Sequence, residues 1–294
     1  MTQVCKIVRP ESLQELRNCL GGQGPVRLLA GGTDFLVRHR EVLLGDCSVV
    51  DCTAVPELRG IALDEQTGEL RVGAAATFTE IGQHAVVAQH APALAEAATG
   101  VGSVQIRNRA TLGGNVANAS PAADSLPALA CLDAVAVVSD SEGKFERRPV
   151  PELIGGFETN ALSADEFILE FRIPLTPGRL SGFQKLGSRE HVSISRINLA
   201  VSLAVREDGF SNLVAWVGTL GPRPAVISLE DAWSAENWDE IADILKGKLA
   251  ALVDERIAGR YSQTYKRSAL QGLGEDLLAR LAGTVACTKK GAAR

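Results

Sequence analysis

Residues 1–55 combine short apolar runs with one amphipathic segment. Apolar runs typical of short strands occur at 4–9, 26–30 and 47–51. Between the first two, Ser12 can cap a helix over 13–20, and Glu15 is placed to complete the cap. Glycines and Pro25 follow this segment and would end the helix. The pattern predicts a small β-α-β-loop-β unit, which we assign as the first domain.

Residues 56–176 mix strand and helix patterns. Apolar and β-branched runs that predict strands occur at 70–74, 134–138 and 168–173. Thr77 or Thr79 can cap a helix that carries Ile81. Further helical stretches are predicted at 92–98 and 122–131, the second with Asp124 in its first turn. We assign these residues as a second domain.

Residues 177–294 contain strands first and helices afterwards. Strands are predicted at 182–186, 198–205 and 213–220. Pro222 and Pro224 would close the last strand, and helices are predicted over 238–254 and 262–282. Strands followed by helices are typical of the α+β class. The third domain is therefore expected to hold a three-stranded antiparallel sheet packed on helices.

The composition is that of an ordinary globular protein. The chain has 294 residues, 46% hydrophobic and 22% charged, which is enough for two or three cores. A net charge of −5 provides no field that would attract nucleic acid or an anionic membrane. No apolar run approaches the length of a membrane span, and the N-terminal residues do not resemble a signal peptide. We expect a cytoplasmic protein without a membrane span.

Two glycine-rich loops are the most informative feature. They read LLAGGTDF over 28–35 and TLGGN over 111–115, the second followed by polar and small residues up to Ser125. Glycines allow successive backbone N–H groups to converge on an anion, so each loop could hold a phosphate. Either loop alone is more often a tight turn. The pair favours a ligand with a central pyrophosphate and polar ends, which is a dinucleotide.

The familiar dinucleotide and phosphate motifs are missing. No G-x4-G-K-[ST] sequence occurs, which excludes a Walker A loop. Gly100 and Gly102 begin a Rossmann-like fingerprint, but Gln105 stands where the third glycine is required. The sequence therefore predicts another scaffold, in which loops from two subdomains clasp the ligand.

The six cysteines do not form a metal-site pattern. Cys47 and Cys52 have the spacing that opens a plant-type iron–sulfur site, but Val55 stands where the next cysteine is required. No C-x2-C occurs, and the four histidines have no ligand spacing. We expect buried free thiols and no metal bound by this chain.

The two loops carry a family resemblance. LLAGGTDF, QIRNRATLGGN over 105–115 and SPAAD over 120–124 resemble, in the same order, the cofactor loops of the flavin-binding subunit of the molybdenum hydroxylases. This family includes xanthine dehydrogenase and carbon monoxide dehydrogenase. The segment over 51–61 resembles the family's connector between two subdomains, and the helix around Tyr265 resembles the end of its third domain. The resemblance extends over nearly the whole chain.

The resemblance implies a two-subdomain PCMH-type FAD-binding fold followed by an α+β domain. It implies that FAD is bound by Leu28, Leu29, Ala30, Gly31, Gly32, Thr33, Asp34, Phe35, Val101, Thr111, Leu112, Gly113, Gly114, Asn115, Asp124, Ile168 and Lys185. The glycines of both loops and Thr33 would present N–H and hydroxyl donors to the pyrophosphate and ribityl chain. Thr111 and Asn115 would add side-chain hydrogen bonds.

Four of these positions lie outside the loops and have separate implied roles. Asp124 would accept a hydrogen bond from a sugar or ribityl hydroxyl, because a carboxylate suits a hydroxyl donor. Val101 and Ile168 would make apolar or backbone contacts. Lys185 would lie close to the flavin, where a cation stabilises its reduced, anionic form. The local sequence alone equally allows Lys185 to be a solvated strand residue.

The resemblance also implies partners. Electrons would come from [2Fe–2S] clusters on a small subunit, after substrate oxidation on a molybdopterin-binding large subunit, and would pass through FAD to NAD or another acceptor. The expected assembly is a dimer of heterotrimers. No acid–base pair or nucleophile is predicted in this chain, as fits a protein whose cofactor carries the chemistry. The alternatives are a stand-alone flavin oxidoreductase, a nucleotide-binding module without redox turnover, and an α/β protein whose glycine loops are only turns.

Overall fold

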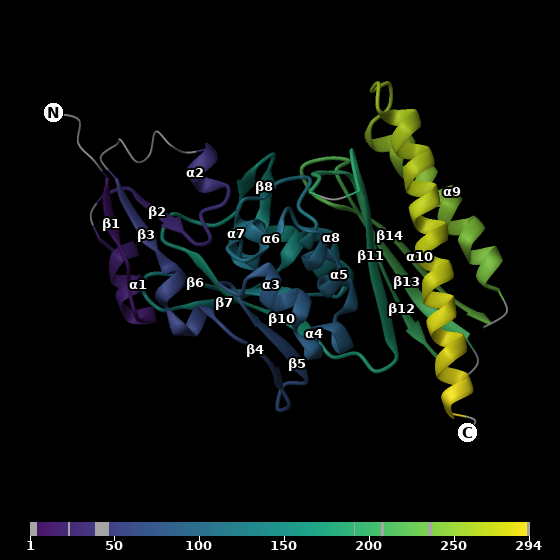
Figure 1. The fold of residues 1–294 in the computed structure, drawn as a ribbon, viewed down its shortest axis with the longest axis horizontal. Coiled ribbons are helices and arrows are strands. Elements are labelled where there is room, and N and C mark those ends of the chain that lie inside the picture. Colours follow the sequence, from purple (N-terminus) through teal and green to yellow (C-terminus); the bar gives the residue numbers. More distant parts are fainter. Residues whose placement is uncertain are drawn as a thin grey trace.

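The computed structural model describes residues 5–22, 24–38, 47–190, 192–206, 209–234 and 237–292. Three larger sheets follow one another along the long axis of the molecule in the order of the sequence (Figure 1). Helices cover these sheets, and a short two-stranded hairpin lies beside the middle one. The expected α+β class is confirmed.

The first sheet is parallel and lies at the end of the molecule coloured purple in Figure 1. Its strands are β1 (Lys6–Val8), β3 (Ser48–Asp51) and β2 (Val26–Leu29), in that spatial order. Helix α1 (Leu13–Leu20) connects β1 to β2. The first strand is shorter than the apolar run predicted, and residue 4 lies outside the described residues.

Local signals set the limits of α1. The Ser12 side chain accepts a hydrogen bond from the Glu15 backbone N–H at 3.2 Å, which confirms the predicted cap. Leu16 is fully buried against Val50 and Val55 in the core of this unit. Because parallel strands end at the same edge of a sheet, the chain leaves β2 and β3 side by side. The first glycine loop and the short helix α2 (Phe35–Arg38) follow β2 at that edge.

The middle sheet is antiparallel and has five strands. In spatial order these are β4 (Ile61–Asp64), β5 (Glu69–Gly73), β10 (Phe167–Pro174), β6 (Val135–Ser139) and β7 (Phe145–Pro149). Its helices are α3 (Phe78–Gln83), α4 (Ala85–His90), α5 (Pro92–Gly100), α6 (Val104–Arg107), α7 (Leu112–Ala117) and α8 (Ser125–Cys131). Single 3-10 turns occur at Cys52–Ala54, Pro56–Leu58 and Val150–Leu153.

Two helices of this unit show how its sequence determines their first turns. Thr77 and Glu80 form a capping box at the start of α3, which decides between the two predicted caps. Helix α8 begins at Ser125, so Asp124 is its N-cap residue and lies before the first turn rather than within it. The side chain of Asp124 makes no capping hydrogen bond. The Asp124 carboxylate therefore does not serve as the cap of α8.

The third sheet has four strands, so the prediction of three was wrong. They are β11 (Arg179–Gly187), β12 (Ser195–Val205), β13 (Gly209–Gly218) and β14 (Ala225–Ser234), all antiparallel. Pro222 and Pro224 form the turn before β14 rather than the end of the sheet. Alternate residues of β14, at 225, 227 and 229, are buried, and this period of two is the signal that was missed.

Two long helices cover one face of the third sheet (Figure 1). Helix α9 (Trp238–Arg256) and helix α10 (Gln263–Ala292) bury leucines such as Leu245, Leu249 and Leu277 against it. The helix predictions over 238–254 and 262–282 are confirmed, although α10 continues further. These helices and the sheet form one hydrophobic core.

An ion pair joins the C-terminal helix α10 to the unit that contains the five-stranded middle sheet, called the middle unit below. Both guanidinium Nη atoms of Arg280 on α10 donate to the carboxylate of Glu96 on α5, at 2.5 and 2.8 Å. The same carboxylate accepts a hydrogen bond from the Phe183 backbone N–H of β11 at 2.7 Å. Gly182 permits α10 to lie this close to β11, because a Cβ at Gly182 would lie 2.7 Å from the Leu277 side chain. The third unit is thereby fixed beside the middle one.

Candidate functional site

The two glycine loops meet, although about 80 residues of sequence separate them. A Cβ on Gly31 would lie 2.0 Å from the Arg109 carbonyl oxygen, just before the second loop. A Cβ on Gly114 would lie 3.7 Å from the Ala30 Cβ. The first and middle units therefore touch where the Gly31 backbone meets the segment that leads into the second loop. Only glycine at position 31 allows this contact.

The first loop has polar groups that find no partner among the residues the structure describes. Gly32 has a φ of +73°, in the left-handed region that glycine adopts without strain. Among the described residues, none accepts a hydrogen bond from the N–H groups of Gly31, Gly32 or Thr33. The buried Oδ2 atom of Asp34 also lacks a partner there. Unpaired donors beside an unpaired acceptor suit a ligand that carries both phosphate oxygens and hydroxyls.

The second loop has a different structure from the one predicted. Thr111 caps α7 by accepting a hydrogen bond from the Gly114 N–H at 3.2 Å. The Gly113 N–H donates to the Ala74 carbonyl at 2.8 Å. The expectation that Gly113 and Gly114 offer N–H donors to a pyrophosphate is therefore not supported, because both N–H groups are already used. Gly113 instead allows close packing, since a Cβ there would lie 2.7 Å from the Ala74 Cβ.

The side-chain oxygen of Asn115 is already used as an acceptor. Its Oδ1 accepts a hydrogen bond from the Ser125 hydroxyl at 2.6 Å, at the start of α8. This bond orients the amide and leaves its NH2 group as the part that could reach a ligand. Leu112, the neighbour of Gly113 in the same helix, is fully buried in the core of the middle unit.

Asp124 and Lys185 form a buried ion pair between the middle and third units. Lys185 Nζ lies 2.7 Å from Asp124 Oδ2 and also donates to the Gly100 carbonyl at 2.8 Å. Asp124 Oδ1 accepts from the Ser195 hydroxyl at 2.5 Å and from Asn198 Nδ2 at 2.8 Å. The Asp124 side chain is only 5% exposed. We call these four side chains the Asp124 network.

The Asp124 network revises two expectations. Asp124 was expected to accept a hydrogen bond from a cofactor hydroxyl, but three donors from the third unit already occupy its carboxylate. Lys185 is not a solvated strand residue, since its side chain is 18% exposed and its ammonium group has three oxygen partners. The sequence analysis missed Ser195 and Asn198. Asn198 lies directly opposite Lys185 in the β11–β12 pairing, so correct strand register would have indicated it.

The remaining predicted residues lie in or beside these elements. Val101 follows α5 and packs against the middle core, and its carbonyl oxygen accepts a hydrogen bond from Arg107 Nη1 at 3.0 Å. Ile168 is buried in β10 opposite Val138, so it could contact a ligand only through its backbone or one edge. Leu28 and Leu29 end β2, Ala30 leads into the first loop, and Phe35 starts α2.

A hairpin of the middle unit reaches over to the first unit. Its strands are β8 (Ile154–Gly156) and β9 (Thr159–Asn160), and Glu158 lies at its tip with a φ of +51°. Arg38, at the end of α2, donates from Nη1 to Glu158 Oε1 at 2.6 Å. Arg38 Nε also lies 3.1 Å from Asp34 Oδ1 in the first loop. Neither Arg38 nor Glu158 was singled out from the sequence.

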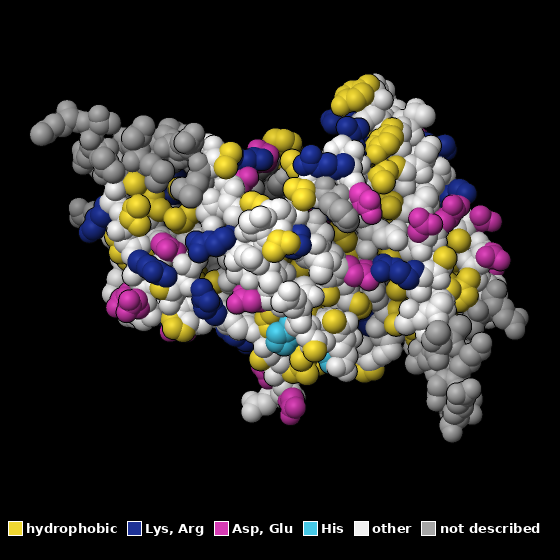
Figure 2. All heavy atoms as spheres, viewed as in Figure 1, with side chains coloured by type: hydrophobic (Ala, Val, Ile, Leu, Met, Phe, Trp, Pro, Cys, Tyr) yellow, Lys and Arg dark blue, Asp and Glu magenta, His cyan; other side chains and the backbone are white. Residues whose placement is uncertain are grey.

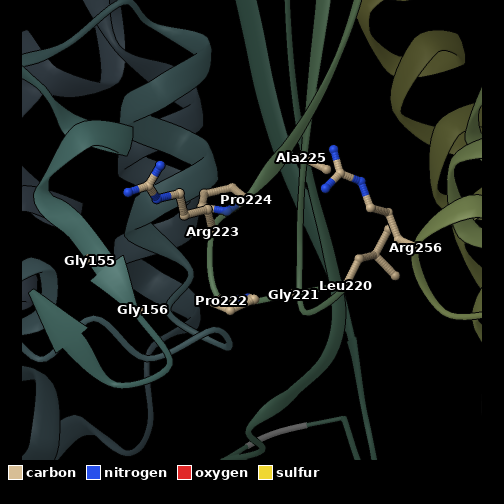
Figure 3. A pocket seen from close by; sticks show the side chains of 9 residues that line it. All are labelled: Gly155, Gly156, Leu220, Gly221, Pro222, Arg223, Pro224, Ala225 and Arg256. Carbon is tan, nitrogen blue, oxygen red and sulfur yellow. The ribbon is translucent and has the colours of Figure 1, made fainter.

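A cavity of about 360 Å³ lies between this hairpin and the turn before β14 (Figure 3). It is lined by Gly155, Gly156, Leu220, Gly221, Pro222, Arg223, Pro224, Ala225 and Arg256. Arg223 extends toward the hairpin, where its Nε donates to the Ile154 carbonyl at 2.6 Å. None of the residues predicted to bind FAD lines this cavity.

The described part of the chain offers no cluster of three or more His, Cys, Asp and Glu side chains that could hold a metal ion. His39 and His191 lie outside the described residues.

Within the described ranges, no helix is both long enough and apolar enough to cross a membrane. On the face shown in Figure 2, acidic and basic side chains are interspersed with scattered hydrophobic ones.

The thiol of Cys52 lies beneath the first loop and is expected to be unreactive. Its Sγ donates to the Leu29 carbonyl at 3.2 Å, and burial raises its pKa to about 12. Burial also raises the pKa of the Cys131 thiol.

Because the thiolate is the reactive form, iodoacetamide near pH 8 should leave both cysteines unmodified in the folded protein. Half-buried Cys19 is the internal control. Peptide mass mapping of native and unfolded protein measures this, and native labelling of Cys52 faster than Cys19 would contradict it.

Comparison with known proteins identifies the family. Residues 3–176 match the model of the FAD binding domain in molybdopterin dehydrogenase. The chain is 35% identical over 222 residues to a putative xanthine dehydrogenase FAD-binding subunit of Escherichia coli K12, covering 74% of each protein. It is 34% identical to the nicotinate dehydrogenase FAD-subunit of Eubacterium barkeri, covering 68% of this chain and 69% of that protein.

A solved structure supports the fold. The reconstituted CO dehydrogenase from Oligotropha carboxidovorans contains a chain that superposes with a TM-score of 0.81 at 21% identity, covering 96% of this chain and 99% of that one. At this identity the likeness establishes the fold alone. The family match includes both glycine loops and Asp124, whereas Lys185 lies beyond it. The chain thus belongs to the FAD-binding domain family of the molybdopterin dehydrogenases, and it is an FAD-binding oxidoreductase subunit of the molybdenum hydroxylase type.

Proposed function

We propose that this subunit holds FAD between the unit of residues 1–55 and the unit of residues 56–176. The observation that carries the proposal is the contact of the two glycine loops, together with three N–H groups and the Asp34 Oδ2 of the first loop that have no partner within the described ranges. Pyrophosphate oxygens accept hydrogen bonds from N–H groups, and a ribose hydroxyl donates to a carboxylate. FAD carries both kinds of group, so the residues present fit it.

The roles of individual residues follow from their available atoms. Gly31, Gly32 and Thr33 would bind phosphate oxygens through their N–H groups. Asn115 would donate from its NH2 group, because Ser125 occupies its oxygen. Thr111, Leu112, Gly113 and Gly114 would form the wall of the site, since capping and packing already use their polar groups. The remaining predicted residues would make the backbone and apolar contacts: Leu28, Leu29, Ala30, Phe35, Val101 and Ile168.

Lys185 would provide positive charge at the edge of the third unit, held in place by Asp124. A fixed cation favours negative charge on a nearby group, particularly where water is excluded. FAD supplies the redox chemistry: it would take electrons from [2Fe–2S] clusters of a partner subunit and pass them to NAD or another acceptor. The chain's own residues bind and orient the cofactor and tune its surroundings.

The proposed partners are a molybdopterin-binding large subunit and a [2Fe–2S] small subunit, in a dimer of heterotrimers in the cytoplasm. The relatives support this, because one is named as an FAD-binding subunit and another as the medium chain of a carbon monoxide dehydrogenase. Purification of the subunit with its co-expressed partners, followed by mass measurement, tests the assembly. Reduction of bound flavin by substrate only in the assembled complex would distinguish it from a stand-alone oxidoreductase.

Absorbance of the purified chain tests the cofactor assignment directly. After incubation with FAD and desalting, the protein should retain the two oxidised-flavin bands, and dithionite should bleach them. Protein that stays colourless both alone and with its partner subunits would contradict FAD binding. Retained flavin that no reductant bleaches would favour a nucleotide-binding module without redox turnover.

Gly32→Val should remove flavin retention. A β-branched side chain at a φ of +73° is strained, and it would also occupy the space beside the unpaired N–H groups. Gly68→Val is the matched control, since Gly68 has a similar φ of +66°, has open space around its Cα and lies in the β4–β5 turn. Both variants carry the same backbone strain, so only Gly32→Val should lose flavin at equal folded yield. Equal retention in both variants would contradict the placement of the phosphate.

A further inference from the structure

We propose that Arg38 and Glu158 are positioning residues that hold the first glycine loop closed on the cofactor and slow its release. This inference rests on the proposed FAD site. We call the pair the Arg38–Glu158 clasp. It connects α2, which follows the first loop directly, to the tip of the β8–β9 hairpin.

The base of the hairpin is fixed to the second loop. Asn160 Nδ2 donates to the Ala117 carbonyl at 2.7 Å, at the end of α7, and α7 starts within the second glycine loop. Buried Ile154 anchors the other strand in the middle core, and its carbonyl accepts from Arg223 Nε. The hairpin is therefore a rigid extension of the unit that carries the second loop. In Figure 1 its label β8 lies between α2 and the third sheet.

The tip of the hairpin is fixed to the first loop through Arg38. Asp34 belongs to that loop, its carbonyl accepts the N–H groups of Val37 and Arg38, and its Oδ1 lies 3.1 Å from Arg38 Nε. Arg38 thus bridges a loop carboxylate and the Glu158 carboxylate. Hydrogen bonding to Glu158 raises the pKa of the Arg38 guanidinium further above its ordinary value. The bridge therefore connects the first glycine loop to the unit that carries the second loop.

Charge rather than apolar packing carries this bridge. Val37 is 73% exposed and Phe157 is 68% exposed, so neither buries much surface between α2 and the hairpin tip. The side chains of Arg38 and Glu158 are 39% and 33% exposed. A pair with this exposure is weakened by salt and contributes modestly to stability. The clasp should therefore act on the opening rate of the loop more than on folding.

The test is the rate of FAD release from the full chain after dilution, followed by flavin fluorescence. Glu158→Gln removes the charge of the hairpin but leaves the Arg38–Asp34 contact in place. We expect release to accelerate about two- to five-fold at low salt. We also expect wild-type release to accelerate when ionic strength rises from about 0.05 M to about 0.5 M, and the variant to lose this dependence.

Two further variants separate positioning from general stability. Arg38→Lys keeps the positive charge and should retain most of the salt dependence. Glu275→Gln breaks an exposed ion pair with Lys246 between α9 and α10, away from the glycine loops, and should leave FAD release unchanged. Release from Glu158→Gln at the wild-type rate and with the wild-type salt dependence would overturn the clasp while leaving the FAD site intact. A wild-type chain that never retains FAD would overturn both proposals.

Discussion

Gly31→Ala is expected to separate the two glycine loops and to abolish FAD retention. The added Cβ would lie 2.0 Å from the Arg109 carbonyl oxygen and 2.6 Å from its carbonyl carbon. Both are backbone atoms, so no side chain can rotate away. The first unit must shift relative to the middle one, which carries its three unpaired N–H groups away from the second loop. We expect the free energy of unfolding to fall by about 1–3 kcal/mol, as for other overpacked contacts.

Gly272→Ala is the control for this experiment. It makes the same chemical change within α10, where nothing lies within 4 Å of the added Cβ. Alanine in a helix interior should stabilise the protein by about 0.5–1 kcal/mol relative to glycine. Urea unfolding and flavin absorbance after desalting measure both variants. A Gly31→Ala protein that retains stoichiometric flavin would mean that the contact of the loops is not needed for binding.

Lys185→Met is expected to have the largest effect on stability. It leaves the Asp124 carboxylate buried between the middle and third units with two neutral donors and no cation. Removing one partner of a buried ion pair typically costs about 3–5 kcal/mol, because the remaining charge stays desolvated. Flavin binding should weaken as well if Lys185 provides the positive charge proposed for it near the flavin. Chemical unfolding and FAD titration measure the two effects separately.

A second substitution identifies the cause. Asp124→Asn in the Lys185→Met background removes the stranded charge, while its amide oxygen can still accept from Ser195 and Asn198. The double variant should therefore regain most of the lost stability. Lys246→Met, at the exposed pair between α9 and α10, should cost about 0–1 kcal/mol. If the double variant were as unstable as Lys185→Met, lost packing of the lysine stem rather than the stranded charge would be responsible.

The Asp124 network also changes how the flavin binding of an Asp124 variant is interpreted. The sequence alone predicts that Asp124→Ala weakens FAD binding without unfolding the chain. In the structure this carboxylate joins two units, so its loss should affect their contact and the position of Lys185 together. A loss of flavin in that variant therefore does not by itself indicate a direct contact between Asp124 and the cofactor.

The sequence by itself determined many of the local elements and the family. Ser12 and Thr77 cap helices in the structure as predicted, because a cap depends on hydrogen bonds between residues three positions apart. The predicted apolar runs correspond to β1, β2, β3, β5, β6 and β10, whereas the edge strands β4 and β7 of the middle sheet and the β8–β9 hairpin were missed. Strands β4 and β7 are largely exposed, so they carry no buried apolar run. The order of LLAGGTDF and QIRNRATLGGN was sufficient to indicate the FAD-binding family, since those motifs lie within contiguous residues.

Only the tertiary structure decided which polar groups remain available for the cofactor. The Gly113 N–H donates to the carbonyl of Ala74, the residue after β5, whereas the N–H groups of Gly31 to Thr33 have no partner among the described residues. Asp124 meets Lys185 and Asn198 across 61 and 74 residues of sequence. Such contacts depend on how whole sheets pack, which no local pattern encodes. The sequence thus determined that two glycine loops exist. Packing decided that the N–H groups of Gly113 and Gly114 have partners, while those of Gly31 to Thr33 have none among the described residues.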